Sequence, residues 1–267
     1  MTPSPRPTFL ILGAQKSATR WLRLNLGLHP QIFTADHEIA FFSSPPRYAQ
    51  GRDWYAGQFA GWDGEPIVGE ATPAYMMYRQ HPRRIAKRVA KFDKEMRLLA
   101  VLRNPIDRAY SGFVHHLKAG RLDPQTDVLD YVSRVRPRVD PLTIVSGGWY
   151  HASLKPYRRR FGDKLLVLLH DDIGEDPAAV YDRALAHVGA DPGFRPSELD
   201  AARFGNLQPK ESGLRAQDGG YRPLDRAQRR ALYRYFADDI AKLEHMIGRD
   251  LDMWRPVVAR KERVPAS

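Results

Sequence analysis

Short apolar runs that alternate with segments of helical periodicity constrain the fold of this chain more than any other feature. The runs occupy residues 8–12, 67–70, 97–102 and 164–169. Strands that are apolar on both faces are typical of a parallel sheet, because helices then cover both sides of it. The sequence therefore predicts an α/β protein with a central parallel sheet flanked by helices.

The segments between the strands extend this prediction. Helices are expected at about 18–28, 81–93, 105–118, 148–161 and 225–247. Another should begin at Asp176-Pro177, because Asp caps a helix and Pro suits its first position. The 267 residues are expected to form one domain, 1–267. Its non-regular parts should be a Pro-rich disordered tail at 1–7, an aromatic loop at 33–62 and irregular lid or loop regions at 122–146 and 191–224.

Composition excludes several kinds of chemistry. The chain has no cysteine, so it has no disulfides, thiolate metal ligands or cysteine nucleophiles, and we expect no metal site. Its net charge of +11, from 42 Lys and Arg against 31 Asp and Glu, should attract anionic ligands. No nucleic-acid-binding motif accompanies this charge, so no nucleic acid partner is expected. No apolar run approaches the roughly 18 residues of a membrane span, and no signal peptide is recognisable, so a cytoplasmic protein without a transmembrane segment is expected.

The first strand leads into the turn GAQKSATRWL, residues 13–22, which has the features of an anion-binding site. Gly13 allows a tight turn, and free backbone amides at the start of the next helix favour a phosphate or sulfate. An ordinary strand-to-helix turn with a solvent-facing lysine is the alternative. The candidate anion-binding residues are Gly13, Gln15, Lys16, Ser17, Ala18, Thr19 and Arg20.

This turn differs from a nucleotide-binding P-loop, G-x-x-x-x-G-K-[ST]. Both glycines of that pattern are missing, since Gln15 stands directly before Lys16 and the upstream segment, which includes Ile11, is apolar. No apolar strand ending in a magnesium-binding Asp follows. A P-loop-type small-molecule kinase is therefore the weaker alternative.

Residues 97–113 carry a second phosphate-binding signal. Arg103 stands at the end of a buried-type strand, and Asn104-Pro105 begins a helix. Ser111 follows eight residues after Arg103, two turns into that helix, where its hydroxyl can face back toward the strand end. Taken alone, this segment could also be a simple helix-capping turn.

Together, the G-x-x-K-S-x-T turn and the R-N-P-x-x-R-x-x-S segment resemble the family of sulfotransferases that use 3′-phosphoadenosine 5′-phosphosulfate. The resemblance implies a P-loop-like three-layer fold and a first loop that holds the 5′-phosphosulfate. It implies that Arg103 and Ser111 hold the 3′-phosphate, that 3′-phosphoadenosine 5′-phosphate is the product, and that no metal is required. It covers nearly the whole chain and looks closest to carbohydrate sulfotransferases of the heparan sulfate type and their bacterial relatives.

Sulfuryl transfer to an alcohol needs a base near the acceptor oxygen and a cation for the charge on the leaving oxygens, the role that Lys16 fits. The family's glutamate in the motif [KN]-E-x-x-F-F corresponds to Glu38. Phe41 and Phe42 are expected to pack beside it and raise its pKa. His37 is the rival base, because imidazole titrates near neutrality. Farther along the chain, two histidines are expected to be structural or acceptor-facing, His115 and His116.

The acceptor side departs from the heparan-type pattern. Ala40 and Ala71 replace a histidine and a lysine, which weakens a heparan-like acceptor and leaves the donor site untouched. Glu70 could orient Lys16 or the acceptor, or could cap the turn through Thr72. The resemblance also implies a late loop over the donor's adenosine and 3′-phosphate, with Gly220, Tyr221 and Arg222 as its candidate residues.

Aromatic residues flank the proposed donor site in sequence, and we expect about half of them to be core. The remainder suit a sugar ring, a glycolipid or another alcohol, so the acceptor is expected to be a small-molecule, glycolipid or carbohydrate alcohol. A homodimer is possible. A non-catalytic polyanion-binding protein is an alternative suggested by the positive charge. The aromatic residues are Trp54, Tyr55, Trp62, Tyr75, Tyr78, Trp149 and Tyr150.

Overall fold

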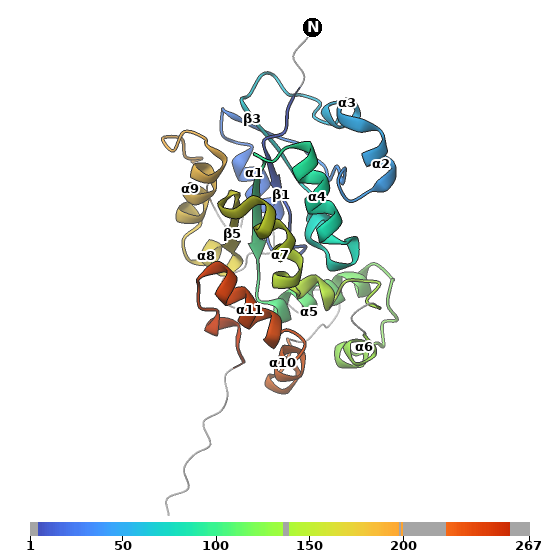
Figure 1. Cartoon of the computed structure of the whole chain (residues 1–267). Coiled ribbons are helices and arrows are strands. Elements are labelled where there is room, and N and C mark those ends of the chain that lie inside the picture. The colour runs from blue at the N-terminus through green and yellow to red at the C-terminus, as the bar shows by residue number, and fades with distance from the viewer. Residues whose placement is uncertain (1–4, 136–138, 198, 200–222, 257–267) are drawn as a thin grey trace, which may run out of the picture.

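Five parallel strands form one sheet in the order β2-β3-β1-β4-β5. The structure is a computed structural model that describes residues 5–135, 139–197, 199 and 223–256 (Figure 1). Phe9 of β1 pairs with Gly69 of β3 on one side and with Arg97 of β4 on the other. The parallel α/β architecture expected from the apolar runs is confirmed. The strands are β1 (Phe9–Ile11), β2 (Ile32–Thr34), β3 (Ile67–Ala71), β4 (Arg97–Leu102) and β5 (Leu165–Leu169).

Two hydrophobic cores cover the two faces of this sheet. Successive side chains of a strand point to opposite faces, so Leu98 and Ala100 of β4 lie in one core and Leu99 and Val101 in the other. The first core is closed by α4 (Pro82–Phe92), α7 (Tyr150–Phe161) and α11 (Ala237–Ile247). The second is closed by α1 (Thr19–Leu26), α8 (His170–Glu175) and α9 (Pro177–Val188), so that α9 and α4 lie on opposite sides of the strands (Figure 1).

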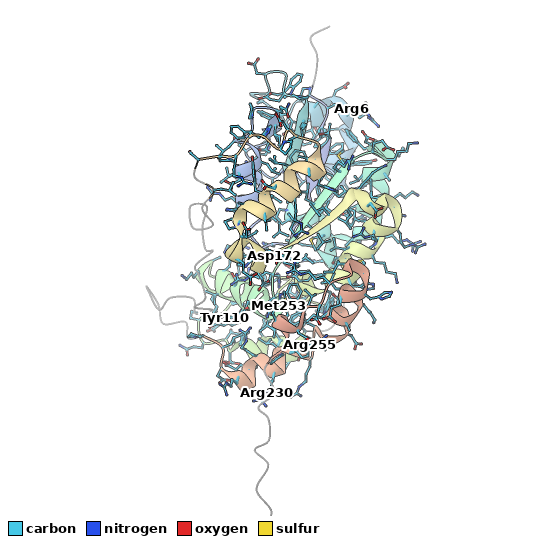
Figure 2. All side chains as sticks on the ribbon, turned by 90° about the vertical axis from the view of Figure 1, so that its left-hand side faces the viewer. Arg6, Tyr110, Asp172, Arg230, Met253 and Arg255 are labelled. Atoms are coloured by element: carbon cyan, nitrogen blue, oxygen red, sulfur yellow. The ribbon has the colours of Figure 1, made fainter. Side chains whose placement is uncertain are left out.

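A group of helices gathers where the strands end. There β4 runs directly into α5 (Pro105–Lys118), with α6 (Val128–Arg134) and α10 (Arg226–Tyr233) nearby (Figure 1). Arg6, before β1, and Arg230 of α10 mark the two opposite ends of the molecule (Figure 2). None of the helices among the described residues is long and apolar enough to cross a membrane.

Several elements differ from the sequence-based expectation. The stretch 33–62 contains part of β2 and two short helices, α2 (Pro45–Ala49) and α3 (Gly51–Ala56), and 122–146 contains α6. The Asp127 side chain accepts from the backbone N–H groups of Leu129 and Asp130, which caps α6. The helix expected at 225–247 is two helices, because the carbonyls of Leu232 and Tyr233 close tight turns and end α10.

Candidate active site

The strand order brings the candidate residues to one edge of the sheet. Because all five strands are parallel, their carboxyl ends meet there. Glu38 lies in the loop after β2, Lys16 in the turn after β1, and Arg103 directly after β4. Lys16 therefore lies between the candidate base and the candidate phosphate-binding arginine.

The turn after β1 has an unusual backbone that requires glycine at one position and strains two other residues. Gly13 has φ of 144°, and a Cβ at this position would lie 2.5 Å from Cγ of Met76, so glycine is required. Lys16 and Ala18 have φ of 69° and 67°, in the left-handed region that costs a non-glycine residue about 1 kcal/mol or more. Helix α1 starts after Ala18 without a side-chain cap, which leaves its first backbone N–H groups available to an anion.

The cations at this edge repel one another. Burial lowers the pKa of Lys16, and repulsion from Arg103 and Arg108 lowers it further. Among the described residues no carboxylate is ion-paired with Lys16, so this repulsion is uncompensated. The arrangement favours a ligand that places negative charge between Lys16 and Arg103.

Tyr150 ties the two cationic segments together. Its hydroxyl lies beside that of the buried Ser17 and donates to the carbonyl of Arg103 at 2.9 Å. Burial raises the pKa of Tyr150 to about 12, so the hydroxyl keeps its proton. Tyr150 is therefore hydrogen-bonded to the end of β4 and lies next to the turn after β1.

Buried hydrogen bonds of Asp140 and Arg108 stabilise the loop that precedes Tyr150. The Asp140 carboxylate accepts from the backbone N–H groups of Val145 at 2.9 Å and Ser146 at 2.7 Å, and from the Ser146 hydroxyl at 2.8 Å. The guanidinium of Arg108, 1% exposed, donates to the carbonyls of Thr143 and Ile144. Sequence analysis missed both charged residues as contributors to the site, although Arg108 lies inside the quoted R-N-P-x-x-R-x-x-S segment.

The loop that carries Glu38 is anchored by buried groups on both sides. Glu38 is exposed, yet desolvation by the surrounding protein raises its pKa. Phe41 and Phe42 point into the core, where Phe41 stacks on Tyr55 at 4.3 Å between ring centroids. The two phenylalanines thus fix the loop.

Glu70 anchors the same loop from β3. Its buried carboxylate accepts from the hydroxyls of Tyr55 at 3.0 Å, Tyr75 and Thr72, and burial raises its pKa while these hydrogen bonds oppose the rise. Thr72 in turn accepts from the backbone N–H of Ala40 at 3.1 Å. Of the roles considered for Glu70, the contact with Thr72 is the one found in the structure.

The remaining candidates occupy different environments. His37 is exposed, and its Nδ1 lies 2.7 Å from the Asp36 carboxylate. His115, one turn after Ser111, is exposed. Partial desolvation by the surrounding protein lowers its pKa, and repulsion from Lys16 lowers it further. His116 is buried and contacts the carbonyl of Leu142 at 3.1 Å, a structural role. Thr19 is buried, Gln15 and Ser111 are partly buried, and Arg20 is exposed. Three late-loop candidates lie outside the described residues: Gly220, Tyr221 and Arg222.

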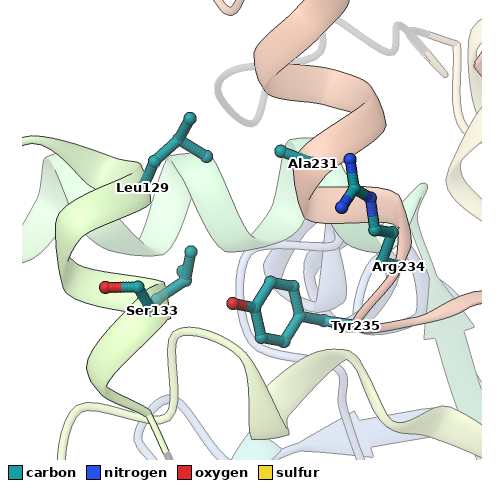
Figure 3. A pocket seen from close by; sticks show the side chains of 6 residues that line it. Leu129, Ser133, Ala231, Arg234 and Tyr235 are labelled. Atoms are coloured by element: carbon teal, nitrogen blue, oxygen red, sulfur yellow. The ribbon is translucent and has the colours of Figure 1, made fainter.

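A small pocket of about 390 Å³ lies apart from this edge, between α6 and α10. Leu129 and Ser133 of α6 face Ala231 of α10 and Tyr235 of the turn after α10 across it, with Arg234 at its rim (Figure 3). The carbonyl of Tyr235 accepts from the indole N–H of Trp149 at 3.0 Å. This contact links the turn between α10 and α11 to the start of α7.

The carboxyl edge of the parallel sheet carries Lys16 and Arg103, and no carboxylate among the described residues is ion-paired with Lys16, an arrangement that favours phosphate or sulfate groups. Residues 6–200 match the family model described as a sulfotransferase domain. The chain belongs to the sulfotransferase family, and the family and fold class predicted from the sequence are confirmed.

Individual relatives agree with this assignment. The chain is 26% identical over 278 residues to human bifunctional heparan sulfate N-deacetylase/N-sulfotransferase 3, an alignment that covers 93% of this chain and 31% of that protein. It is 28% identical to mouse heparan sulfate glucosamine 3-O-sulfotransferase 3B1, covering 68% of this chain and 46% of the relative. It therefore spans less than half the length of these two relatives. The crystal structure of a sulfotransferase from Alicyclobacillus acidocaldarius superimposes with a TM-score of 0.74 at 29% identity, over 94% of this chain and 99% of that one.

Proposed function

We propose that this chain transfers a sulfuryl group from 3′-phosphoadenosine 5′-phosphosulfate to a hydroxyl group of a carbohydrate. The observation that carries the proposal is the pair of cations beyond adjacent strand ends, Lys16 and Arg103, which no carboxylate of the described residues pairs with and whose repulsion helps to lower the pKa of Lys16. A donor with two separated anionic groups suits two separated cationic segments, and binding it would relieve the repulsion. The family match supports this reading over a P-loop-type kinase.

Each part of the site has a role in this proposal. The turn 13–20 and the start of α1 hold the 5′-phosphosulfate, and Arg103 and Ser111 hold the 3′-phosphate. The donor supplies the sulfuryl group, whose bond to the 5′-phosphate oxygen breaks as the acceptor oxygen bonds to sulfur. Lys16 stabilises the negative charge left on the phosphate oxygens.

Glu38 receives the proton of the acceptor hydroxyl in this proposal. Its raised pKa brings the carboxylate closer to the proton affinity that a general base needs near neutral pH. His37 is the rival base, and the Asp36 carboxylate at 2.7 Å would hold its ring. Substitution of each residue separately distinguishes the two.

The acceptor is proposed to enter beside Tyr78 and Trp149. These rings meet edge to face at 5.3 Å between centroids, and Tyr78 lines an open pocket of about 880 Å³. Trp149 directly precedes Tyr150, which contacts the carbonyl of Arg103, so the Tyr78–Trp149 pair connects this pocket to the donor segments. Aromatic faces beside polar groups suit a sugar ring, and two relatives are named for action on heparan sulfate. A glycolipid or another alcohol is the alternative acceptor.

Calorimetric titration with 3′-phosphoadenosine 5′-phosphate and with ATP tests the donor assignment. The bisphosphate should bind at least about 100-fold more tightly, a difference of about 2.7 kcal/mol, and Arg103→Ala should remove this preference. Equal affinity for the two nucleotides, or magnesium-dependent ATP turnover, would contradict the proposal. We also propose that no metal is needed, so sulfation of a sugar acceptor should persist in excess EDTA.

A further inference from the structure

A groove between α4 and α7 leads away from the proposed acceptor pocket. The pocket of about 880 Å³ and a second one of about 640 Å³ share His81 and Arg83 in their linings, so they lie next to each other and together form the depression described here. Ala152, Pro156 and Arg160 recur every four residues of α7, on one helix face, and together span about 12 Å of its length. We call this depression the α4–α7 groove.

The two ends of the groove differ in chemistry. The end next to Trp149 is lined by Tyr78, Val139 and Pro141, with Tyr78 40% and Val139 61% exposed. The residues that line the far pocket are all cationic or titratable to a cation: His81, Arg83, Arg84, Lys87 and Arg160.

The cations of the far end are available to a ligand. Within the described chain none of them is ion-paired with a carboxylate, whereas Arg6, Arg229, Arg249 and Arg255 are paired with Asp or Glu. The one acidic residue that lines the groove is Asp140, whose carboxylate is already occupied by backbone N–H groups and the Ser146 hydroxyl. Within the described residues the exposed cations of the groove thus have no carboxylate partner, and an anionic ligand could supply one.

We propose that the α4–α7 groove binds an acidic oligosaccharide, with sugar rings over the Tyr78 end and carboxylate or sulfate groups on the cations of α4 and Arg160. This inference rests on the proposed function, because it takes the bound chain to be the acceptor. An oligosaccharide fits better than an anionic membrane surface, since the cations line a concavity between two helices that adjoins the proposed acceptor pocket. The cations of α4 then recognise the acidic groups. Ala40 and Ala71 cannot do so, because they stand where the heparan-type pattern has a histidine and a lysine.

The test compares two triple variants of the full chain that lose the same charge. Arg83→Gln/Arg84→Gln/Lys87→Gln removes the groove cations, and Lys94→Gln/Arg97→Gln/Lys242→Gln removes exposed cations elsewhere. With a fluorescent heparin oligosaccharide as probe, the groove variant should bind roughly tenfold more weakly and the control within about twofold of the parent. An uncharged dextran oligosaccharide of similar length should bind both variants equally.

Three results would overturn the inference. Equal weakening in both variants would show general charge attraction, and unchanged heparin binding in the groove variant would remove the site. Loss of binding to phosphatidylserine vesicles with heparin binding intact would assign the groove to a membrane. Thermal unfolding and calorimetry with 3′-phosphoadenosine 5′-phosphate accompany each variant. If the parent fails to bind that nucleotide, the proposed function fails, while the heparin comparison still decides the groove.

Discussion

Two cationic regions of this protein differ mainly in burial. Lys16 in the turn after β1 and Arg108 in the first turn of α5 are desolvated, and buried hydrogen bonds hold Arg108 in place. Arg83, Arg84 and Lys87 of the α4–α7 groove are exposed. A charge interaction strengthens as the local dielectric falls, so a ligand anion gains more at the buried cluster than in the groove. The comparison indicates strong, geometrically strict recognition in the first region and weaker, salt-sensitive recognition in the second.

The largest effect is expected at Lys16. Lys16→Ala should lower kcat/KM for sulfation by about 10² to 10³, because it removes the cation that stabilises the leaving phosphate oxygens. Steady-state kinetics with labelled donor measures the change, and Lys94→Ala serves as the exposed control. Parent-like kcat/KM in the Lys16 variant would show that the buried cluster has no special role.

A somewhat smaller effect is expected at Glu38. Glu38→Gln should reduce kcat by about 10² while affinity for 3′-phosphoadenosine 5′-phosphate stays constant, because the carboxylate acts on the acceptor proton only. His37→Gln is the matched variant. If it lowers kcat more than Glu38→Gln does, the base is His37.

Asp140 tests how the buried cluster is held. Asp140→Asn should lower the free energy of unfolding by about 2 kcal/mol, because a charged acceptor of several buried donors is lost. Denaturation in urea measures this, and Asp163→Asn at an exposed ion pair should change it by less than about 0.5 kcal/mol. Similar changes in the free energy of unfolding for the two variants would mean that the hydrogen bonds of Asp140 contribute little to the stability of the buried region.

The plot of kcat/KM against pH should be bell-shaped and narrower than the ordinary pKa values of a glutamate and a lysine would give. The pKa of Glu38 is raised from 4.5, so activity falls on the acid side at a higher pH than for an ordinary glutamate. The pKa of Lys16 is lowered from 10.5, so activity falls earlier on the alkaline side. Glu38→Gln should remove the acid limb. An acid limb that survives in this variant would assign it to another group.

The free energy of unfolding should respond to Lys16 in the direction opposite to activity: on the alkaline side it should rise with pH, whereas activity falls. In the window just below pH 10.5 the unfolded chain binds more protons at this residue than the folded chain, so the Lys16 contribution to stability rises with pH. Lys16→Met should flatten this rise in urea denaturation measured from pH 8 to 10.5. An unchanged pH slope would mean that Lys16 is not desolvated.

The smallest effect separates the regions by salt. Between about 50 and 500 mM salt, heparin binding should weaken several-fold more than binding of 3′-phosphoadenosine 5′-phosphate, because exposed charges are screened more than buried ones. Calorimetry at both salt concentrations checks this. Equal salt dependence would erase the distinction between the two regions.

Much of the fold was predictable from local patterns. The helix expected at 105–118 is Pro105–Lys118, and the expected start at Asp176-Pro177 is the capped start of α9. Both have strong local signals, a cap residue followed by proline. Helices α6 and α8 were missed because they are short, and α8 follows β5 without an intervening loop. The break between α10 and α11 was missed because it lies at Phe236, which is buried against Gly148.

The candidate site was likewise predictable only where its residues form a local sequence pattern. Lys16 and Arg103 could be proposed from the sequence because a cationic turn or an arginine after an apolar strand is a local pattern, and parallel strands place such residues at one edge. Asp140 and Tyr150 carry no comparable pattern, since their partners are backbone groups and residues brought close by folding. Their site roles, like those of all candidates, stay proposals until they are measured.

By itself, the sequence determined the strand and helix alternation, the cationic turn after β1 and the resemblance to sulfotransferases, because each depends on residues close together in the chain. Only the tertiary structure decided which cations are desolvated and which have no carboxylate partner among the described residues. It also decided how Glu70 and Asp140 hold the loops, and where α4 and α7 enclose a groove. Burial and long-range hydrogen bonding depend on neighbours that the linear order of residues leaves unspecified.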